Sequence, residues 1–270
     1  MGERGSFERV VELRGVSVLR SGQPIVADVD WRVAPGERWV IVGPNGSGKT
    51  TLLQLVSTYL WPSRGQLTIL DQRIGAVDAR ELRRQIGYAS AALAAAIDDS
   101  LAGVDVVMTA RHAALAPWWH EFSSADRERA LELMALLGVE GLAARTFGTL
   151  SSGERQRLQI ARTLMTDPDL LLLDEPAAGL DLGAREALTT RLGRLVAQSR
   201  PVGVILVTHH VEEIPPGFTH ALVLRGGRVV ACGPIGSTLT GPILSDAFGL
   251  RLDVEQTAGR YRAWGVNGSA

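Results

Sequence analysis

The sequence predicts an α/β fold in which a mainly helical lobe is inserted into a core that contains a parallel sheet. Short continuous apolar runs are typical of strands buried on both faces of such a sheet, and three occur, at 39–42, 170–173 and 204–207. A segment rich in Ala, Leu, Glu and Arg separates the first run from the other two and indicates helices. We therefore expect a core formed by 1–90 and 162–270, and a helical lobe at 91–161.

Local patterns predict the remaining elements in order. Segments rich in Val and Leu, or short and bounded by turn residues, predict strands at 10–18, 25–33 and 66–70. Helical spacing or clustered charge predicts helices at 50–58, 79–85 and 124–137, with Ser124 as the N-cap of the last. Residues 221–230 indicate a β-hairpin that turns at Gly226 and Gly227.

Composition excludes several classes of protein. The 270 residues include 28 Lys and Arg against 29 Asp and Glu, a net charge of −1. This balance argues against broad charge-driven binding of nucleic acid. The single cysteine, Cys232, excludes an internal disulfide and a cysteine zinc cluster. No apolar stretch approaches the roughly 18 residues of a membrane-spanning helix, and no signal peptide is evident.

Residues 43–50 carry the strongest chemical pattern in the chain. They read GPNGSGKT and match the phosphate-binding loop, with a buried strand before them and a helix after them. Glycines allow several backbone N–H groups to converge on an anion at a helix N-terminus. A glycine-rich turn with an incidental lysine would not require this context. We expect a nucleoside triphosphate site made by Gly43, Pro44, Asn45, Gly46, Ser47, Gly48, Lys49, Thr50 and Thr51.

Particular chemical roles follow for four side chains. Lys49 would reach the β- and γ-phosphates, and the Thr50 hydroxyl would bind Mg²⁺. Asp174 and Glu175 follow the apolar run 170–173, at the end of a predicted strand. Beside a phosphate loop, Asp174 is expected to hold the same Mg²⁺. Glu175 could polarise water for attack on the γ-phosphate, although a surface ion-pair role is the alternative.

A further segment, 150–157, identifies a family resemblance. It reads LSSGERQR, and it lies upstream of the carboxylate strand. With the phosphate loop, Asp174-Glu175, Gly179-Leu180-Asp181 and Thr208-His209, it resembles the ATP-binding cassette (ABC) family over nearly the whole chain. The resemblance implies a P-loop NTPase core, an antiparallel β portion and a helical lobe.

The resemblance also implies a mechanism. Two cassettes, either two copies of this chain or this chain with a homologue, would sandwich two ATP molecules head to tail. Ser151 and Gly153 would then act on ATP held by the partner's phosphate loop, at the N-terminus of the following helix. Asp181 would communicate across the dimer interface. His209 would contact the γ-phosphate and help hold the attacking water, and the adjacent His210 is its rival.

Three positions depart from the family pattern. Ser152 replaces the first of two signature glycines. The aromatic residue that stacks on adenine is absent, and Arg20 falls at its position, where a guanidinium could stack on the base instead. Ala91 falls where relatives generally carry a glutamine that contacts Mg²⁺ and responds to the membrane partner, and 86–98 contains no glutamine.

The resemblance therefore favours an ATP-hydrolysing subunit at the cytoplasmic face of a membrane, with ATP and Mg²⁺ as cofactors and separate permease subunits as partners. Trp118 and Trp119 could anchor a permease or belong to the core of the lobe. The tail at 244–261 resembles importers of iron chelates, haem and metal oxyanions. A soluble ATP-driven switch without a permease is the alternative that Ala91 suggests. A small-molecule kinase or GTPase would not require 150–154.

Overall fold

The structure, a computed structural model, describes residues 7–112, 122–197 and 203–266. It divides into two compact units, residues 1–83 with 202–270, and residues 84–201. The predicted helical lobe at 91–161 falls inside the second unit, and its bounds stay a prediction. No helix in the described part of the chain is long and apolar enough to cross a membrane.

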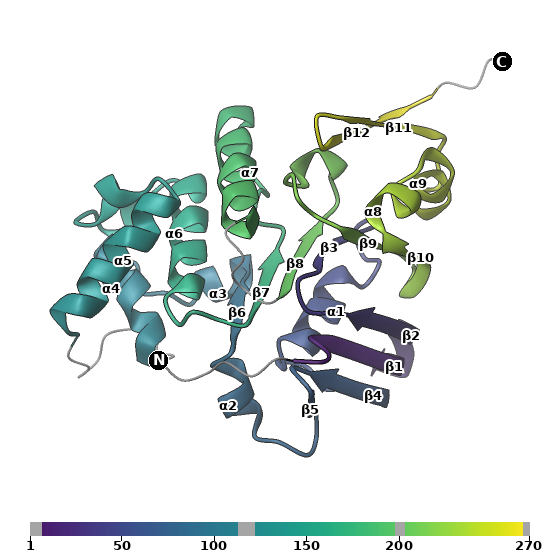
Figure 1. The fold of residues 1–270 in the computed structure, drawn as a ribbon, viewed down its shortest axis with the longest axis horizontal. Coiled ribbons are helices and arrows are strands. Elements are labelled where there is room, and N and C mark those ends of the chain that lie inside the picture. Colours follow the sequence, from purple (N-terminus) through teal and green to yellow (C-terminus); the bar gives the residue numbers. More distant parts are fainter. Residues whose placement is uncertain (1–6, 113–121, 198–202, 267–270) are drawn as a thin grey trace. The chain divides into compact units, whose positions relative to one another are not determined.

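The first unit contains a four-stranded antiparallel sheet in the order β2-β1-β4-β5 (Figure 1). Val11 in β1 pairs with Val33 in β2 on one side and with Ile69 in β4 on the other. This sheet is the antiparallel β portion that the family resemblance implies. Its strands are β1 (Val11–Arg20), β2 (Gln23–Val33), β4 (Arg64–Ile69) and β5 (Gln72–Arg73).

A second group of strands in this unit positions the phosphate loop. Strand β3 pairs in parallel with both β8 and β9, and β10 pairs with β9 in antiparallel fashion. The central residues of β3, β8 and β9 are apolar and buried, which is typical of strands covered on both faces. The elements are β3 (Arg38–Val42), α1 (Lys49–Val56), α2 (Ala79–Arg83), β8 (Gly203–Thr208), η4 (Val211–Glu213), β9 (His220–Arg225) and β10 (Arg228–Pro234).

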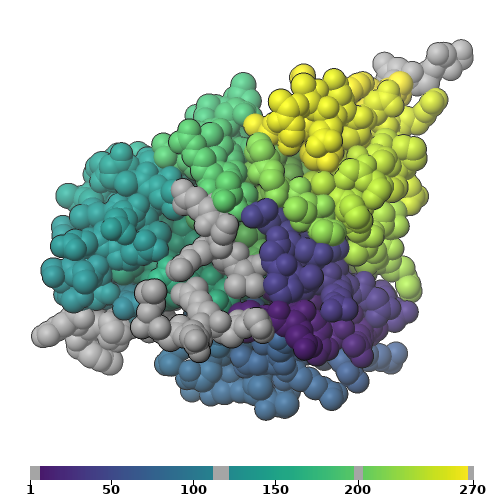
Figure 2. Space-filling view, in the orientation of Figure 1, coloured from purple at the N-terminus to yellow at the C-terminus, as the bar shows by residue number. Residues whose placement is uncertain are grey.

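The first unit ends in a hairpin that the sequence analysis did not predict. Helices α8 (Ile235–Thr238) and α9 (Gly241–Phe248) precede the antiparallel pair β11 (Leu252–Thr257) and β12 (Arg260–Gly265). Figure 2 shows this pair in yellow, at the surface beside the yellow-green α9. In β11 only Leu252 to Glu255 alternate between apolar and polar residues, and the last three residues are polar and exposed. This alternation is too short for a clear strand prediction.

In the second unit, β6 (Ile86–Ala89) and β7 (Leu170–Asp174) pair in parallel, with Ala89 opposite Leu173. Helices α4 and α5 pack on α6, the helix that begins within the signature segment 150–157 (Figure 1). The helices are α3 (Ala91–Ala94), α4 (Gly103–Met108), η1 (Thr109–His112), α5 (Ser124–Leu136), η2 (Glu140–Leu142), η3 (Phe147–Thr149), α6 (Ser152–Leu164) and α7 (Leu182–Ala197).

The three buried strands, the hairpin at Gly226-Gly227 and the helices after the phosphate loop and at 124–137 are confirmed. The N-cap of α5 was wrongly predicted. Ser123 rather than Ser124 caps the helix, because Asp126 stands three residues after Ser123 and completes a reciprocal capping box. Strand β6 was missed, since its four residues are too few for a clear pattern. Trp118 and Trp119 lie outside the described residues.

Candidate functional site

The phosphate loop in the first unit approaches neighbouring backbone so closely that its glycines are required. A Cβ atom at Gly43 would lie 2.3 Å from the Leu224 carbonyl oxygen in β9. At Gly48, where φ is +98°, a Cβ atom would lie 2.9 Å from the Ile25 oxygen in β2. Any side chain at either position would therefore push the loop away from the two sheets that support it.

Lys49 and Ser47 place polar groups inside this loop. Lys49 is only 4% exposed, and its Nζ donates hydrogen bonds to the carbonyl oxygens of Gly43, at 2.8 Å, and Pro44, at 3.1 Å. The Ser47 Oγ is buried and meets no hydrogen-bond partner within the described ranges. A buried hydroxyl without a partner is costly, so its presence in the loop fits a site where a ligand oxygen completes the bonding.

Helix α1 begins directly inside the loop. Gly48 is its N-cap, no side chain caps the helix, and its first turn contains no acidic residue. Thr50 is exposed in this turn, next to Thr51. The positive end of the helix dipole and the Lys49 ammonium therefore lie together without a carboxylate in the first turn, an arrangement that attracts an anion.

His209 lies at the same sheet edge as the phosphate loop. Val42 of β3 pairs with Thr208 of β8 in parallel register, so Gly43 and His209 each follow directly at the carboxyl ends of adjacent strands. The His209 and His210 ring centroids are 4.1 Å apart, but His209 is half-buried whereas His210 is exposed. This difference favours His209 as the histidine at the site.

The second unit places the two carboxylates at the end of β7. Asp174 is 9% exposed, and the Tyr88 hydroxyl donates to its Oδ2 at 3.3 Å. Glu175 is half-buried and has a φ of +49°, in the left-handed region. A bulky residue adopts this conformation only where the surroundings impose it, which is common at functional sites.

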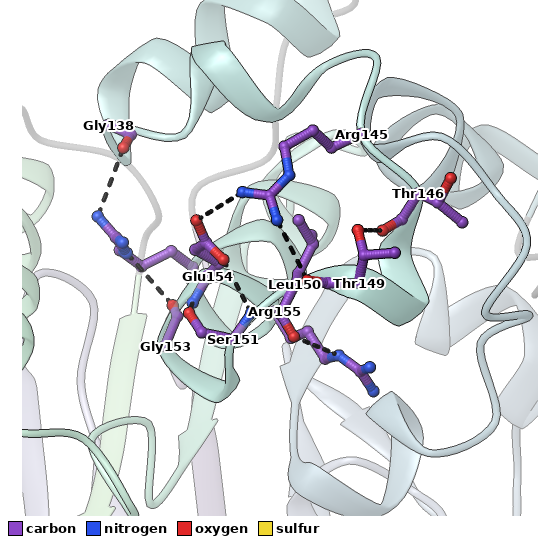
Figure 3. A network of polar contacts seen from close by, with 10 residues as sticks. Gly138, Arg145, Thr146, Thr149, Leu150, Ser151, Gly153, Glu154 and Arg155 are labelled. Atoms are coloured by element: carbon purple, nitrogen blue, oxygen red, sulfur yellow. Dashed lines mark hydrogen bonds and ion pairs between the residues drawn. The ribbon is translucent and has the colours of Figure 1, made fainter.

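The signature segment forms the N-terminus of α6 (Figure 3). Ser151 is the N-cap, and its Oγ accepts from the Glu154 N–H at 3.3 Å. The Glu154 carboxylate in turn accepts from the Ser151 N–H at 2.8 Å. This bond from the Ser151 backbone is the main reason why the pKa of Glu154 lies below its ordinary value.

Three arginines fasten the segment to its surroundings (Figure 3). Arg155 donates to the Leu150 oxygen at 3.1 Å and the Gly148 oxygen at 2.6 Å, and Arg145 contacts Glu154 at 3.2 Å. Arg157 donates to the Gly153 oxygen at 3.2 Å. The signature backbone is therefore held before any ligand binds.

Gly153 brings the signature against the segment that carries Asp181. A Cβ atom at Gly153 would lie 3.1 Å from the Leu180 Cδ2. The next residue, Asp181, is exposed and accepts from the Ala184 N–H at 2.8 Å at the start of α7. The signature and the Asp181 turn, which are far apart in sequence, are therefore neighbours.

The predicted site residues thus fall into two groups. The phosphate loop, Arg20 and His209 belong to the first unit, and Arg20 is exposed at the end of β1. Asp174, Glu175, the signature and Asp181 belong to the second, as does Ala91, the first residue of α3. Tyr88, beside Asp174, was not predicted, because a tyrosine in a four-residue strand carries no recognisable pattern.

The hydrogen bond between Thr208 and Glu213 was also not predicted. The Thr208 hydroxyl donates to the Glu213 Oε2 at 2.5 Å, and both residues are buried. They flank His209 and its neighbour His210. No sequence pattern links a threonine to a glutamate five residues later. Only the structure shows that this bond joins the residues before and after His209.

Comparisons with known proteins agree with this arrangement. The sequence model of the ABC transporter family matches residues 26–178, more than half of the chain. The ABC transporter ATP-binding protein YlmA of Bacillus subtilis is 39% identical over 240 residues, which are 88% of this chain and 90% of the relative. The hemin import ATP-binding protein HmuV of Thermobifida fusca is 32% identical over 248 residues, 91% of this chain and 84% of that protein.

A solved structure shows the same fold. A bacterial ABC transporter cassette, solved as a dimer, superimposes with a TM-score of 0.72 at 24% identity, covering 83% of this chain and 98% of its own. The phosphate loop, the Asp174-Glu175 strand end and the capped signature helix occur in one chain that shares both sequence and fold with these proteins. The chain belongs to the ATP-binding cassette family of ABC transporter ATP-binding subunits.

Proposed function

We propose that this protein binds and hydrolyses ATP as a head-to-tail dimer and powers a separate membrane permease. The observation that carries the proposal is the pair Asp174-Glu175 at the end of a buried strand, in a chain that also has a complete phosphate loop. Family membership supports ATP as the ligand. The head-to-tail arrangement, the magnesium ion and the residue roles below are parts of the proposal.

The phosphate loop binds the triphosphate. Backbone N–H groups of residues 43–50 and the Ser47 hydroxyl donate to phosphate oxygens, and Lys49 exchanges its bonds to loop carbonyls for the β- and γ-phosphates. Arg20, exposed at the end of β1, stacks on the adenine.

The Thr50 hydroxyl and the Asp174 carboxylate hold Mg²⁺, because both present the hard oxygen atoms that this ion prefers. The ion, when bound, neutralises charge on the phosphates. Tyr88 supports this role, since its hydroxyl donates to Asp174 at 3.3 Å and restrains the carboxylate.

Glu175 polarises the attacking water. The water oxygen forms a bond to the γ-phosphorus, the bond from that phosphorus to the β–γ bridging oxygen breaks, and Glu175 receives the proton. His209 contacts the γ-phosphate and orients the water, and Lys49 stabilises the charge that develops on the leaving ADP.

The signature acts on the ATP of the second cassette, which is another copy of this chain or a homologue. The Ser151 hydroxyl and the Gly153 N–H face an anion at the N-terminus of α6. Asp181 lies on the turn that packs against Gly153 and communicates between the two sites. The dimeric bacterial cassette supports this assembly.

Power for a permease is the use of hydrolysis that the named relatives support, since one of them serves hemin import. The protein would then work at the cytoplasmic face of a membrane. One observation favours a second function, a soluble switch without a permease. Ala91, in place of glutamine, follows β6 at the strand edge where Asp174 ends β7, so an amide is missing beside the magnesium ligand.

Replacing Glu175 by Gln tests the proposal. The amide cannot accept the proton from water but keeps the shape of the side chain, so kcat should fall by at least about a hundredfold. ATP binding should persist, and ATP should then trap a dimer, measured by light scattering during size-exclusion chromatography.

Lys49→Ala is the matched control, because it should lose nucleotide binding and remain monomeric with ATP. Full ATPase activity in Glu175→Gln would contradict the assignment of the base. A Glu175→Gln protein that binds ATP but stays monomeric would contradict the head-to-tail dimer.

A further inference from the structure

The C-terminal hairpin contacts the segment that follows His209. From β12, the Arg260 Nη2 donates to the Glu212 carbonyl oxygen at 2.7 Å, and the Ala263 N–H donates to the Glu212 Oε1 at 3.0 Å. Glu212 is the central residue of the three-residue turn η4. The hairpin is therefore hydrogen-bonded to this turn through both the backbone and the side chain of Glu212.

The turn η4 is hydrogen-bonded to the residues on either side of His209. The Glu213 carboxylate accepts from the Thr208 hydroxyl, and the Glu213 N–H donates to the His210 oxygen at 3.1 Å. The His210 N–H donates to the Thr208 Oγ1 at 3.0 Å. His209 thus lies in a closed loop of bonds that begins at β8 and ends at η4, and a shift of η4 would move its backbone.

The hairpin is itself anchored to the sheet that carries the phosphate loop. The Leu252 N–H donates to the Ser245 Oγ of α9 at 2.8 Å, and Arg225 of β9 contacts the Asp246 carboxylate at 2.8 Å. Tyr261 in β12 is 4% exposed, so it packs the hairpin inward. A displacement of the sheet should therefore displace η4 through the hairpin.

We propose that Glu212 is a positioning residue through which the C-terminal hairpin holds His209 in place for hydrolysis. The inference rests on the proposed function of His209. A three-residue 3₁₀ turn has few bonds of its own, and displacement of a group at the γ-phosphate by about 1 Å costs as much as a hundredfold in rate. External bonds to η4 are therefore expected to act on turnover rather than on nucleotide affinity.

The test compares Glu212→Ala with Glu212→Gln. The alanine variant loses the acceptor for the Ala263 N–H, and loss of one such bond is expected to lower kcat about tenfold. The glutamine variant keeps an oxygen acceptor and should restore kcat. The KM for ATP and the affinity for ADP should change less than about twofold in both variants, because phosphate contacts are unaffected. Arg262→Ala, on the exposed face of the same strand, is the control that should keep the activity of the unmodified protein.

A double-variant cycle separates positioning from general destabilisation. If Glu212 acts through His209, Glu212→Ala should lower the residual rate little further in a His209→Ala background. Unchanged kcat in Glu212→Ala would overturn the inference while Glu175→Gln still tests the hydrolytic function. A tenfold loss that persists in the His209→Ala background would also overturn it. Thermal unfolding of each variant verifies folding, and Arg260→Ala supplies a second probe of the same contact if Glu212→Ala does not fold.

Discussion

At the scale of single residues, Ser47 shows how a missing hydrogen-bond partner can indicate a binding site. Its hydroxyl is buried and meets no hydrogen-bond partner within the described ranges. Such a group destabilises the empty protein, since a lost bond to water is not replaced. A bound phosphate would supply the partner, so stability and binding should respond to this side chain in opposite directions.

Ser47→Ala is therefore expected to leave the melting temperature of the nucleotide-free protein unchanged or slightly higher. Its affinity for ATP should fall roughly tenfold or more, because a hydrogen bond to a charged oxygen contributes about 1.5–3 kcal/mol. Differential scanning fluorimetry, with and without ATP, measures both quantities.

Ser57→Ala is the matched control for this change. Ser57 is also a buried serine, but its Oγ donates to the Gln54 oxygen at 3.2 Å. Its removal should lower the melting temperature and leave the ATP-dependent shift intact. Equal effects of the two substitutions on ATP binding would contradict a specific role for Ser47.

At the scale of elements, helix α6 is organised at its N-terminus by a charged cap. The pKa of Glu154 is lowered from 4.5, chiefly by the Ser151 N–H that donates to its carboxylate. A group whose pKa is depressed by folding stabilises the folded state above its unfolded pKa, and that contribution is lost as the pH falls through the folded value. The signature cap should therefore weaken below pH 4.5.

Glu154→Gln tests this dependence. The variant should be less stable than the unmodified protein near about pH 7, and the difference should shrink below the unfolded pKa, where the carboxyl becomes protonated. Urea unfolding midpoints across this pH range measure it. Glu140→Gln, an exposed glutamate in η2, is the control. A stability difference that does not change with pH would contradict a charge-dependent cap.

At the scale of the whole molecule, the part of the chain that the structure describes has no helix able to cross a membrane. The proposed function includes separate permease subunits as partners. Trp118 and Trp119, which could anchor a permease or belong to the core of the lobe, lie outside the described residues, so the partner must be sought by experiment.

Affinity purification of the tagged protein from detergent-solubilised membranes should recover an integral membrane protein, identified by mass spectrometry. The same purification from the soluble fraction is the control and should not enrich it. Repeated recovery of only ribosomes or DNA from both fractions would favour the soluble switch, for which Ala91 is the structural argument.

The sequence by itself predicted the elements whose patterns are local. The apolar runs of β3, β7 and β8 are buried, and a strand buried on both faces requires apolar residues on both. The phosphate loop could be predicted from its glycines, because a backbone that approaches β9 and β2 so closely has no room for a side chain. These residues and the family resemblance were sufficient to predict the fold and to name the candidate site.

The tertiary structure decided the features that depend on contacts between distant segments. The Tyr88 hydroxyl donates to the Asp174 carboxylate across two paired strands, and the Arg260 side chain donates to the Glu212 carbonyl oxygen from the C-terminal hairpin. The first of these hydrogen bonds joins residues that are 86 positions apart, and the second joins residues that are 48 positions apart. Bonds over such separations leave no periodic pattern in a sequence. Only the folded chain brings their donors and acceptors together, and these contacts determine which side chains support the site.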